Sequence, residues 1–170
     1  MTDKTENILR NLRGSNKLRV LFVCLGNICR SPAAEGVMRS IVESNNAGER
    51  WHIDSAGMGS WHIGQLSDQR MRVHARRRGY ELNHHARQVK PADFDEFDMI
   101  IPMDAQNRAD LMAMAPTPEA QEKIVPMAEF FTIATRYDHV PDPYYEGAEG
   151  FELVLDLLED GCAVLFDKLR

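Results

Sequence analysis

Hydrophobic residues gather in short runs that alternate with longer segments of helical periodicity. The first run, LRVLFVC over residues 18–24, is almost continuously apolar, as expected for a strand buried on both faces of a parallel sheet. Further strands are predicted over residues 51–55, 97–103 and 123–127, and helices after Ser31-Pro32 (with Ser31 as the cap) and over residues 68–78, 105–114 and 151–169. This alternation predicts an α/β fold: a single-domain, flavodoxin-like three-layer sandwich with a small parallel sheet of about four strands and helices on both faces.

The N-terminal residues 1–17 differ from the rest of the chain, because they are polar apart from Ile8, Leu9 and Leu12. They are expected to form a flexible, loosely held extension with at most one amphipathic turn. The chain has 170 residues, so residues 18–170 fit one domain with a full core better than two domains.

Composition and charge exclude several classes of function. The chain is 44% hydrophobic and 27% charged, and its net charge of -6 argues against general nucleic-acid binding, which needs a basic surface. No apolar run approaches the roughly 20 residues that cross a bilayer, and the first residues lack the apolar segment of a signal peptide, so no membrane partner is expected. The three cysteines are expected to be reduced thiols in the cytoplasm.

The nonapeptide CLGNICRSP places Cys24 at the carboxyl end of a buried strand and just before a helix, where open α/β sheets bind ligands. Backbone N–H groups of the loop and the helix N-terminus can converge on one anion. Gly26 and Asn27 suit the positive φ angles of such a cradle, and Arg30 adds a planar fork that matches two phosphoryl oxygens. The positive field favours the thiolate form of Cys24, to which Ser31 can donate a hydrogen bond.

This string, a Cys, five residues, Arg, Ser and Pro with Gly-Asn-Ile-Cys inside, resembles the signature of the low-molecular-weight protein tyrosine phosphatases. The resemblance extends over most of the chain and assigns residues 18–170 to the phosphatase domain. It implies Cys24 as the nucleophile and Arg30 as the residue that grips the phosphoryl oxygens. The residues implied in substrate binding within the loop are Leu25, Gly26, Asn27, Ile28, Cys29 and Ser31. The alternative, a buried apolar Cys24 with a surface Arg30, does not account for the strand–loop–helix pattern.

A phosphate ester needs its leaving oxygen protonated, and Asp142 in VPDPYYEG is the best candidate for that acid. The family's general acid lies in a matching Asp-Pro-Tyr loop, so the resemblance implies this role for Asp142. It also implies that Trp61, in DSAGMGSWHIG, and Tyr144 form two aromatic walls of a slot that fits a phenyl ring. The structural alternatives are a turn at Asp142 and core packing of Trp61.

Residues outside the loop are implied as supports for it. In the family a His and a Ser hydrogen-bond the loop Asn, and these map to His84, Ser55 and Asn27. His85 is adjacent to His84, so the choice between the two depends on register. The segment IIPMDAQN resembles the family's third strand and the acidic residue that follows it, Asp104.

The predicted function is therefore a phosphotyrosine-protein phosphatase that forms a phosphocysteine intermediate, with Asp142 as general acid and then general base. The expected partners are tyrosine-phosphorylated proteins or peptides, with inorganic phosphate and similar oxyanions as inhibitors. Neither a cofactor nor a metal is expected, since the histidines show no zinc-like spacing with cysteine. The enzyme is also expected to be redox-sensitive, because Cys29 lies in the same curled loop as Cys24 and can protect it as a disulfide.

Three other functions stay open. Protein-arginine phosphatases of the same family carry Thr where this chain has Ile28, which favours phosphotyrosine. Thiol-dependent arsenate reductases relay oxidation through a second cysteine pair in mid-chain, and residues 65–121 contain no cysteine. A non-catalytic phosphopeptide-binding module would not need both Cys24 and Asp142. The basic run over residues 70–78 is interpreted as a solvated helix face, with steering of acidic phosphopeptides as the alternative.

Overall fold

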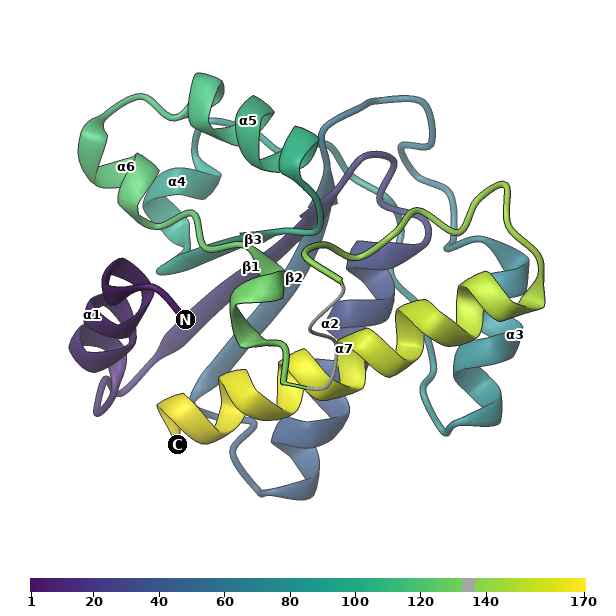
Figure 1. Ribbon diagram of the computed structural model, residues 1–170, viewed down its shortest axis with the longest axis horizontal. Coiled ribbons are helices and arrows are strands. Elements are labelled where there is room, and N and C mark those ends of the chain that lie inside the picture. The colour runs from purple at the N-terminus through teal and green to yellow at the C-terminus, as the bar shows by residue number, and fades with distance from the viewer. Residues whose placement is uncertain (133–136) are drawn as a thin grey trace.

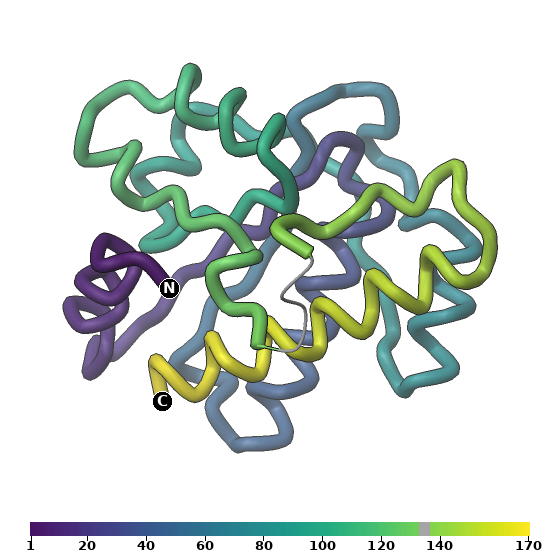
Figure 2. The backbone as a smooth tube through the Cα atoms, in the orientation of Figure 1, coloured from purple at the N-terminus to yellow at the C-terminus, as the bar shows by residue number. Residues whose placement is uncertain are grey.

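The computed structural model describes residues 1–132 and 137–170 (Figures 1 and 2). Its centre is a parallel sheet with strand order β2-β1-β3. The central strand β1 (Leu18–Cys24) pairs along its whole length with β2 (Trp51–Gly57) and over four residues with β3 (Met99–Pro102). Every residue of β1 except Arg19 is buried, which explains the nearly continuous apolar run.

Helices cover both faces of this sheet (Figure 1), which confirms the predicted three-layer α/β architecture. Successive side chains of β1 point to opposite faces: Val20 and Phe22 belong to one hydrophobic core, Leu21 and Val23 to a second. The first core contains side chains of α2 (Arg30–Ser44) and α7 (Ala148–Leu169), with α3 (Gln69–Arg77) packed on α7. The second contains side chains of α4 (Asp93–Glu96), α5 (Ala105–Met114) and α6 (Pro118–Glu122).

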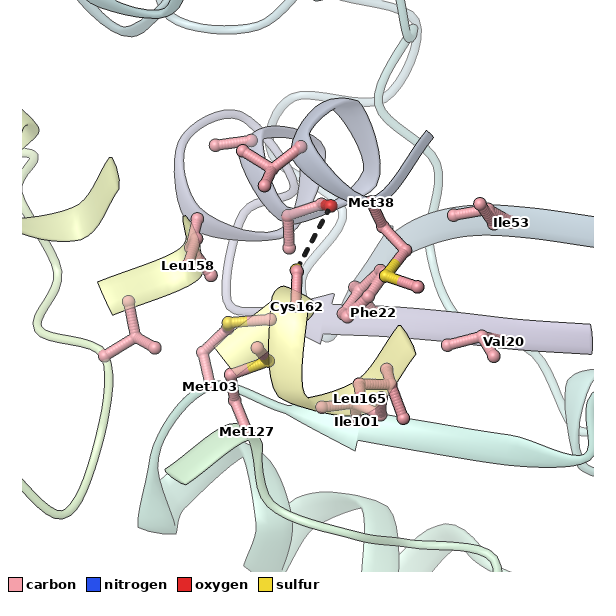
Figure 3. Packing of buried hydrophobic residues seen from close by; sticks show 14 of the residues in the cluster. Val20, Phe22, Met38, Ile53, Ile101, Met103, Met127, Leu158, Cys162 and Leu165 are labelled. Atoms are coloured by element: carbon pink, nitrogen blue, oxygen red, sulfur yellow. Dashed lines mark hydrogen bonds between the residues drawn. The ribbon is translucent and has the colours of Figure 1, made fainter. Parts of the chain in front are cut away.

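Cys162 of α7 lies in the centre of the first core (Figure 3). Its Sγ is 3.9 Å from the carbonyl oxygen of Ala34, and burial raises the pKa of the thiol well above its ordinary value. This cysteine is therefore a core residue, as its position on the apolar stripe of the last helix suggests. Neither α7 nor any other helix in the described ranges is both long and apolar enough to cross a membrane.

The fourth strand, expected over residues 123–127, is reduced to an isolated parallel bridge between Ile124 and Ile100. Two backbone hydrogen bonds form it, from Ile100 N–H to the Lys123 carbonyl and from Val125 N–H to the Ile100 carbonyl, both 2.9 Å. The next bond of this ladder would run from the N–H of residue 102 to the Val125 carbonyl, but Pro102 of β3 has no N–H. After Pro126 the chain turns into the 3-10 helix η1 (Met127–Phe130). The sheet therefore has three strands among the described residues rather than about four.

The N-terminal segment contains a docked helix, α1 (Asp3–Leu12), where the sequence suggested a loosely held extension. Thr2 caps the helix, and Leu9 is fully buried in the same core as α7. The hydroxyls of Thr2 and Thr5 both donate to Glu129 Oε1 of η1, each at 2.6 Å. These contacts join residues more than a hundred positions apart and hold the N-terminal segment on the domain. The sequence of that segment alone indicates no more than a short amphipathic turn.

Candidate active site

The loop between β1 and α2, residues 24–31, is called the cysteine loop below. α2 begins at Arg30 with Cys29 as its N-cap, and no side chain caps it, so the prediction that Ser31 caps this helix is wrong. Ser31 lies inside the first turn, and its hydroxyl faces the loop: Ser31 Oγ is 3.0 Å from Cys24 Sγ. This contact can stabilise a Cys24 thiolate by hydrogen bonding.

The cysteine loop is curled by one residue with a positive φ, Asn27 at 58°. Gly26 lies outside the left-handed region, contrary to the prediction. Its missing side chain instead makes room for His62, because a Cβ at Gly26 would lie 3.1 Å from His62 Cδ2. At the end of β2, a Cβ on Gly57 would lie 2.9 Å from the Leu25 carbonyl oxygen, so this glycine permits the close approach of strand and loop.

The side chain of Asn27 holds the loop from below. Its Oδ1 accepts from the Arg87 N–H at 3.0 Å, and a backbone N–H can only donate, which fixes the orientation of the amide. The Nδ2 group then donates to Ser31 Oγ at 2.8 Å and to Ser55 Oγ at 3.1 Å. His84 Nε2 lies 2.8 Å from Asn27 Oδ1. The register thus places His84, rather than its neighbour, beside Asn27.

Glu35, one turn into α2, extends this network. Its Oε1 accepts from Ser55 Oγ at 2.8 Å and lies 3.3 Å from His84 Nδ1, and its Oε2 accepts from Arg39. Within the described part of the chain, Glu35, Asp54 and His84 have ligand atoms of metal-binding type within 4.8 Å of one another. Because Glu35 and His84 already contact Ser55 and Asn27, we interpret the group as a hydrogen-bond network that positions the loop.

Arg30 is buried, and Asp104 at the end of β3 holds it in place. Arg30 NH1 donates to Asp104 Oδ2 at 2.6 Å and to the Val140 carbonyl at 3.1 Å, and NH2 lies 3.7 Å from Asp142 Oδ2. Burial on its own would lower the pKa of Arg30, but the surrounding Cys24, Asp104 and Asp142 raise it above its ordinary value. The guanidinium is therefore a fixed positive charge beside Cys24.

A cavity of about 210 Å³ opens above Cys24. Its lining residues are Cys24, Leu25, Gly26, Ile28, Cys29, Arg30, Trp61, His62, Asp142, Tyr144 and Tyr145. Trp61 is 67% exposed, which excludes core packing for this side chain. Its indole lies against Gly59, where a Cβ would come within 1.9 Å of the ring.

Asp142 lies on the acid loop, residues 140–145, at the rim of this cavity. Its Oδ1 accepts from the N–H of Tyr144 at 3.1 Å, so the turn considered as the alternative is present together with an accessible carboxylate. Tyr144 packs edge-to-face on Tyr145, with ring centres 5.0 Å apart. Tyr144 and Trp61 are both partly exposed cavity residues, as a slot for a flat ring requires.

Most of the predicted catalytic and substrate-binding residues therefore line this cavity, but two of the substrate-binding residues do not. Asn27 and Ser31 lie beneath the loop and are buried away from the cavity. Sequence reasoning missed His62 and Tyr145 as lining residues, although each is adjacent to a predicted wall. It also gave Asp104 no role, although the carboxyl ends of neighbouring parallel strands meet at one edge, and this signal could have placed Asp104 beside the loop.

A family model described as low molecular weight phosphotyrosine protein phosphatase matches residues 19–170. The chain belongs to this family. The match leaves α1 (Asp3–Leu12) outside.

Known relatives agree with this membership. A putative low molecular weight protein-tyrosine-phosphatase of Synechocystis is 43% identical over 152 residues, which cover 89% of this chain and 96% of the relative. A crystal structure of a protein tyrosine phosphatase from Entamoeba histolytica with Hepes in the active site matches with a TM-score of 0.87 and 44% identity, over 90% of this chain and 97% of that one. The Drosophila arginine phosphatase is more distant in sequence, at 32% identity with a TM-score of 0.82 over 88% of this chain and 96% of that one. The chain is thus a phosphatase of the low-molecular-weight family.

Proposed function

We propose that this phosphatase hydrolyses phosphotyrosine in proteins or peptides through a phosphocysteine intermediate on Cys24. The observation that supports the proposal most directly is the cavity shared by Cys24, Arg30 and Asp142, with Trp61 and Tyr144 at its mouth. A thiolate nucleophile, a fixed cation and a carboxyl group that gives a proton are the three groups that hydrolysis of a phosphate monoester by this route needs. The aromatic side chains give the phenyl ring of phosphotyrosine a surface to stack on.

The reaction has two steps. The Cys24 thiolate attacks phosphorus in line, the bond to the leaving oxygen breaks, and Asp142 gives that oxygen its proton. The Asp142 carboxylate then takes a proton from water, which attacks the phosphocysteine and releases inorganic phosphate and the Cys24 thiolate. Ser31, 3.0 Å from Cys24 Sγ, stabilises the thiolate as nucleophile and as leaving group.

Arg30 stabilises the equatorial oxygens during both steps. Asp104 and the Val140 carbonyl occupy NH1, which leaves the Nε and NH2 edge for two phosphoryl oxygens. The charge costs little reorganisation at the moment of reaction, because its partners already hold it in place. Inorganic phosphate and similar oxyanions are expected to compete for the same donors.

We place the enzyme in the cytoplasm, because the reaction needs a reduced Cys24. Cys24, Cys29 and Cys162 are all free thiols in the structure, and thiols stay reduced in that compartment.

Phosphotyrosine peptides should be hydrolysed with a kcat/KM about 10- to 100-fold higher than matched phosphoserine peptides. The phenyl ring can bury its faces between Trp61 and Tyr144, and burying a side chain of that size stabilises a complex by about 1.5–3 kcal/mol. The measurement is phosphate release from peptides that differ only in the phosphorylated residue. Equal efficiency on the two esters would exclude the aromatic slot.

The same assay should include phosphoarginine and arsenate with a thiol donor. The similarity to the Drosophila arginine phosphatase keeps phosphoarginine as a second candidate substrate. Ile28, which lines the cavity where the arginine phosphatases carry Thr, favours the aryl ester. Faster turnover of phosphoarginine than of phosphotyrosine would reverse that assignment, and arsenate reduction would identify the reductase chemistry.

Oxidation should be reversible in the wild-type enzyme and much less so in Cys29→Ser. Burial raises the pKa of Cys29 well above its ordinary value, so peroxide should oxidise Cys24 first, to a sulfenic acid. The Cys29 thiol lines the same cavity and can then attack that sulfur, with loss of water and formation of a disulfide. A reducing thiol reopens the disulfide and restores activity.

The measurement is recovered activity after peroxide and then a thiol, together with peptide mapping. Cys162→Ser serves as the matched control, because Cys162 is fully buried on α7 and does not line the cavity. Equal recovery in wild type and Cys29→Ser, with no Cys24–Cys29 cross-link, would show that Cys29 only packs beneath the loop.

A further inference from the structure

Arg70 stands apart from the rest of the basic run over residues 70–78. Arg78, at the other end of the run, is held by three carboxylates of α7: Glu152, Asp156 and Glu159. Arg70 instead reaches the region of the acid loop, where its guanidinium carbon lies 5.3 Å from the centre of the Tyr144 ring. It also lies 4.9 Å from the centre of the Phe151 ring in the first turns of α7. Tyr144, which forms an exposed wall of the cavity, therefore has the cation of Arg70 packed against its ring.

The guanidinium of Arg70 is fixed by a two-pronged contact with Asp68. Arg70 Nε is 3.1 Å from Asp68 Oδ1, and NH2 is 2.9 Å from Oδ2. Burial on its own would raise the pKa of Asp68, but the bonds from Arg70 hold it below its ordinary value, so the pair is ionic at neutral pH. The same carboxylate caps α3 by accepting from the Arg70 N–H at 2.9 Å.

Asp68 is in turn attached to the cysteine loop. Its backbone N–H donates to the Ile28 carbonyl oxygen at 2.8 Å. On the other side, the Tyr144 N–H donates to Asp142 Oδ1 at 3.1 Å. A continuous path of contacts thus leads from the cysteine loop through Asp68, Arg70 and Tyr144 to Asp142. The acid loop itself has no helix or strand that would hold Asp142 in place.

We propose that Arg70 is a positioning residue for the general acid: it fixes the acid loop relative to the cysteine loop by clamping Tyr144. This inference rests on the proposed function, because it assigns a partner to Asp142. Arg70 does not line the cavity, so it acts on the reaction through Tyr144 and Asp142, and its main effect is expected on the steps in which Asp142 gives or takes a proton. A guanidinium can do this where an ammonium cannot, since its flat face lies on the ring while its edge bonds Asp68.

The test is Arg70→Met, which keeps a long unbranched side chain and removes both the charge and the fork. Values of kcat/KM are measured for aryl phosphates whose leaving phenols range from acidic to weakly acidic, because this constant includes only steps up to departure of the phenol. We expect a fall of about 3- to 30-fold for phenyl phosphate, the range that loss of a cation–π contact supports. The fall should shrink for the most acidic phenols, which leave without a proton.

Repeating the Arg70 substitution in a variant that lacks the general acid makes the test specific. In Asp142→Ala, the additional change Arg70→Met should cost less than about twofold, because the residue through which Arg70 acts is gone. Arg76→Met is the matched control: it removes an arginine of the same helix whose partner is Glu81, on the surface, and should retain wild-type values throughout. Unfolding temperature and inorganic phosphate binding are recorded for each variant to show an intact cysteine loop. If Arg70→Met does not fold, Arg70→Gln, which can still bond Asp68, is judged by the same criteria.

The inference is overturned if Arg70→Met matches Arg76→Met, if it slows all leaving groups equally, or if its full effect persists without Asp142. Failure of the proposed function has a different signature, because wild type and Arg76→Met would then be as inactive on aryl phosphates as Arg70→Met.

Discussion

Replacing Cys24 by serine is expected to reduce phosphotyrosine turnover to background, a loss of roughly 10⁵-fold or more. A serine hydroxyl is not ionised near neutral pH. Arg30 and the Ser31 hydroxyl stabilise a thiolate at this position, but neither of them replaces the missing nucleophile. The fold should survive, because the substitution is nearly isosteric at the end of β1. Phosphate binding should survive as well, since the donors of the cysteine loop and Arg30 remain.

The measurement pairs a turnover assay with phosphate binding by calorimetry or by a shift in unfolding temperature. Cys162→Ser is the control: its thiol is equally buried but lies in the α2–α7 core, so this variant should lose stability and not turnover. Appreciable hydrolysis by Cys24→Ser would contradict the assignment of the nucleophile.

Asp142→Ala should slow hydrolysis of phosphotyrosine by about 10²–10⁴-fold, the usual contribution of general acid catalysis. Asp142 Oδ1 also accepts a hydrogen bond from Tyr144, so alanine removes an acid and a turn contact together. Asp142→Asn separates the two, because the amide oxygen can keep the Tyr144 contact but the side chain cannot give up a proton in the reaction. A comparable loss in both variants is the expected result.

The dependence on leaving group decides whether this loss is chemical. Substrates with acidic phenols should suffer less than phenyl phosphate, because their leaving oxygen needs no proton. Asp138→Ala is the control, since Asp138 is an exposed carboxylate four residues earlier that pairs with His139. A penalty that is the same for every leaving group, or a large effect of Asp138→Ala, would assign Asp142 a structural role.

The pair of buried Arg30 and half-buried Asp104 shows how the fold maintains a charge in the site. An ionised group such as the Arg30 guanidinium is costly to bury, and the geometry of its partners must be good to offset that cost. Here Asp104 Oδ2 accepts from Arg30 while Oδ1 accepts from the N–H of Asn107 at the start of α5, so the helix and the arginine share one carboxylate. Asp104 is therefore both a helix cap and the anchor of Arg30.

The sequence by itself determined the parts of the protein that depend on local order. The apolar run of β1, the compact loop that follows it and the helical stripe of α7 are all encoded within short windows, because burial and helix periodicity repeat along the chain. The family signature lies in one nonapeptide and so was legible without a structure. The role predicted for Asp142 came from the resemblance of its Asp-Pro-Tyr loop to that of the family, because its local context alone also fits a turn.

Only the tertiary structure decided how distant segments meet. Arg30 and Asp104, 74 positions apart, pair because β3 lies parallel to β1 and both strands end at the same edge of the sheet. Leu9 is buried because α7, from the far end of the chain, supplies the apolar surface that stabilises α1. The fourth strand is lost because Pro102 of β3 cannot donate the next hydrogen bond of the ladder, although the apolar pattern of residues 123–127 predicts a strand. A pattern in the sequence specifies which face of an element is apolar, whereas strand order and register specify which distant residue that face will contact.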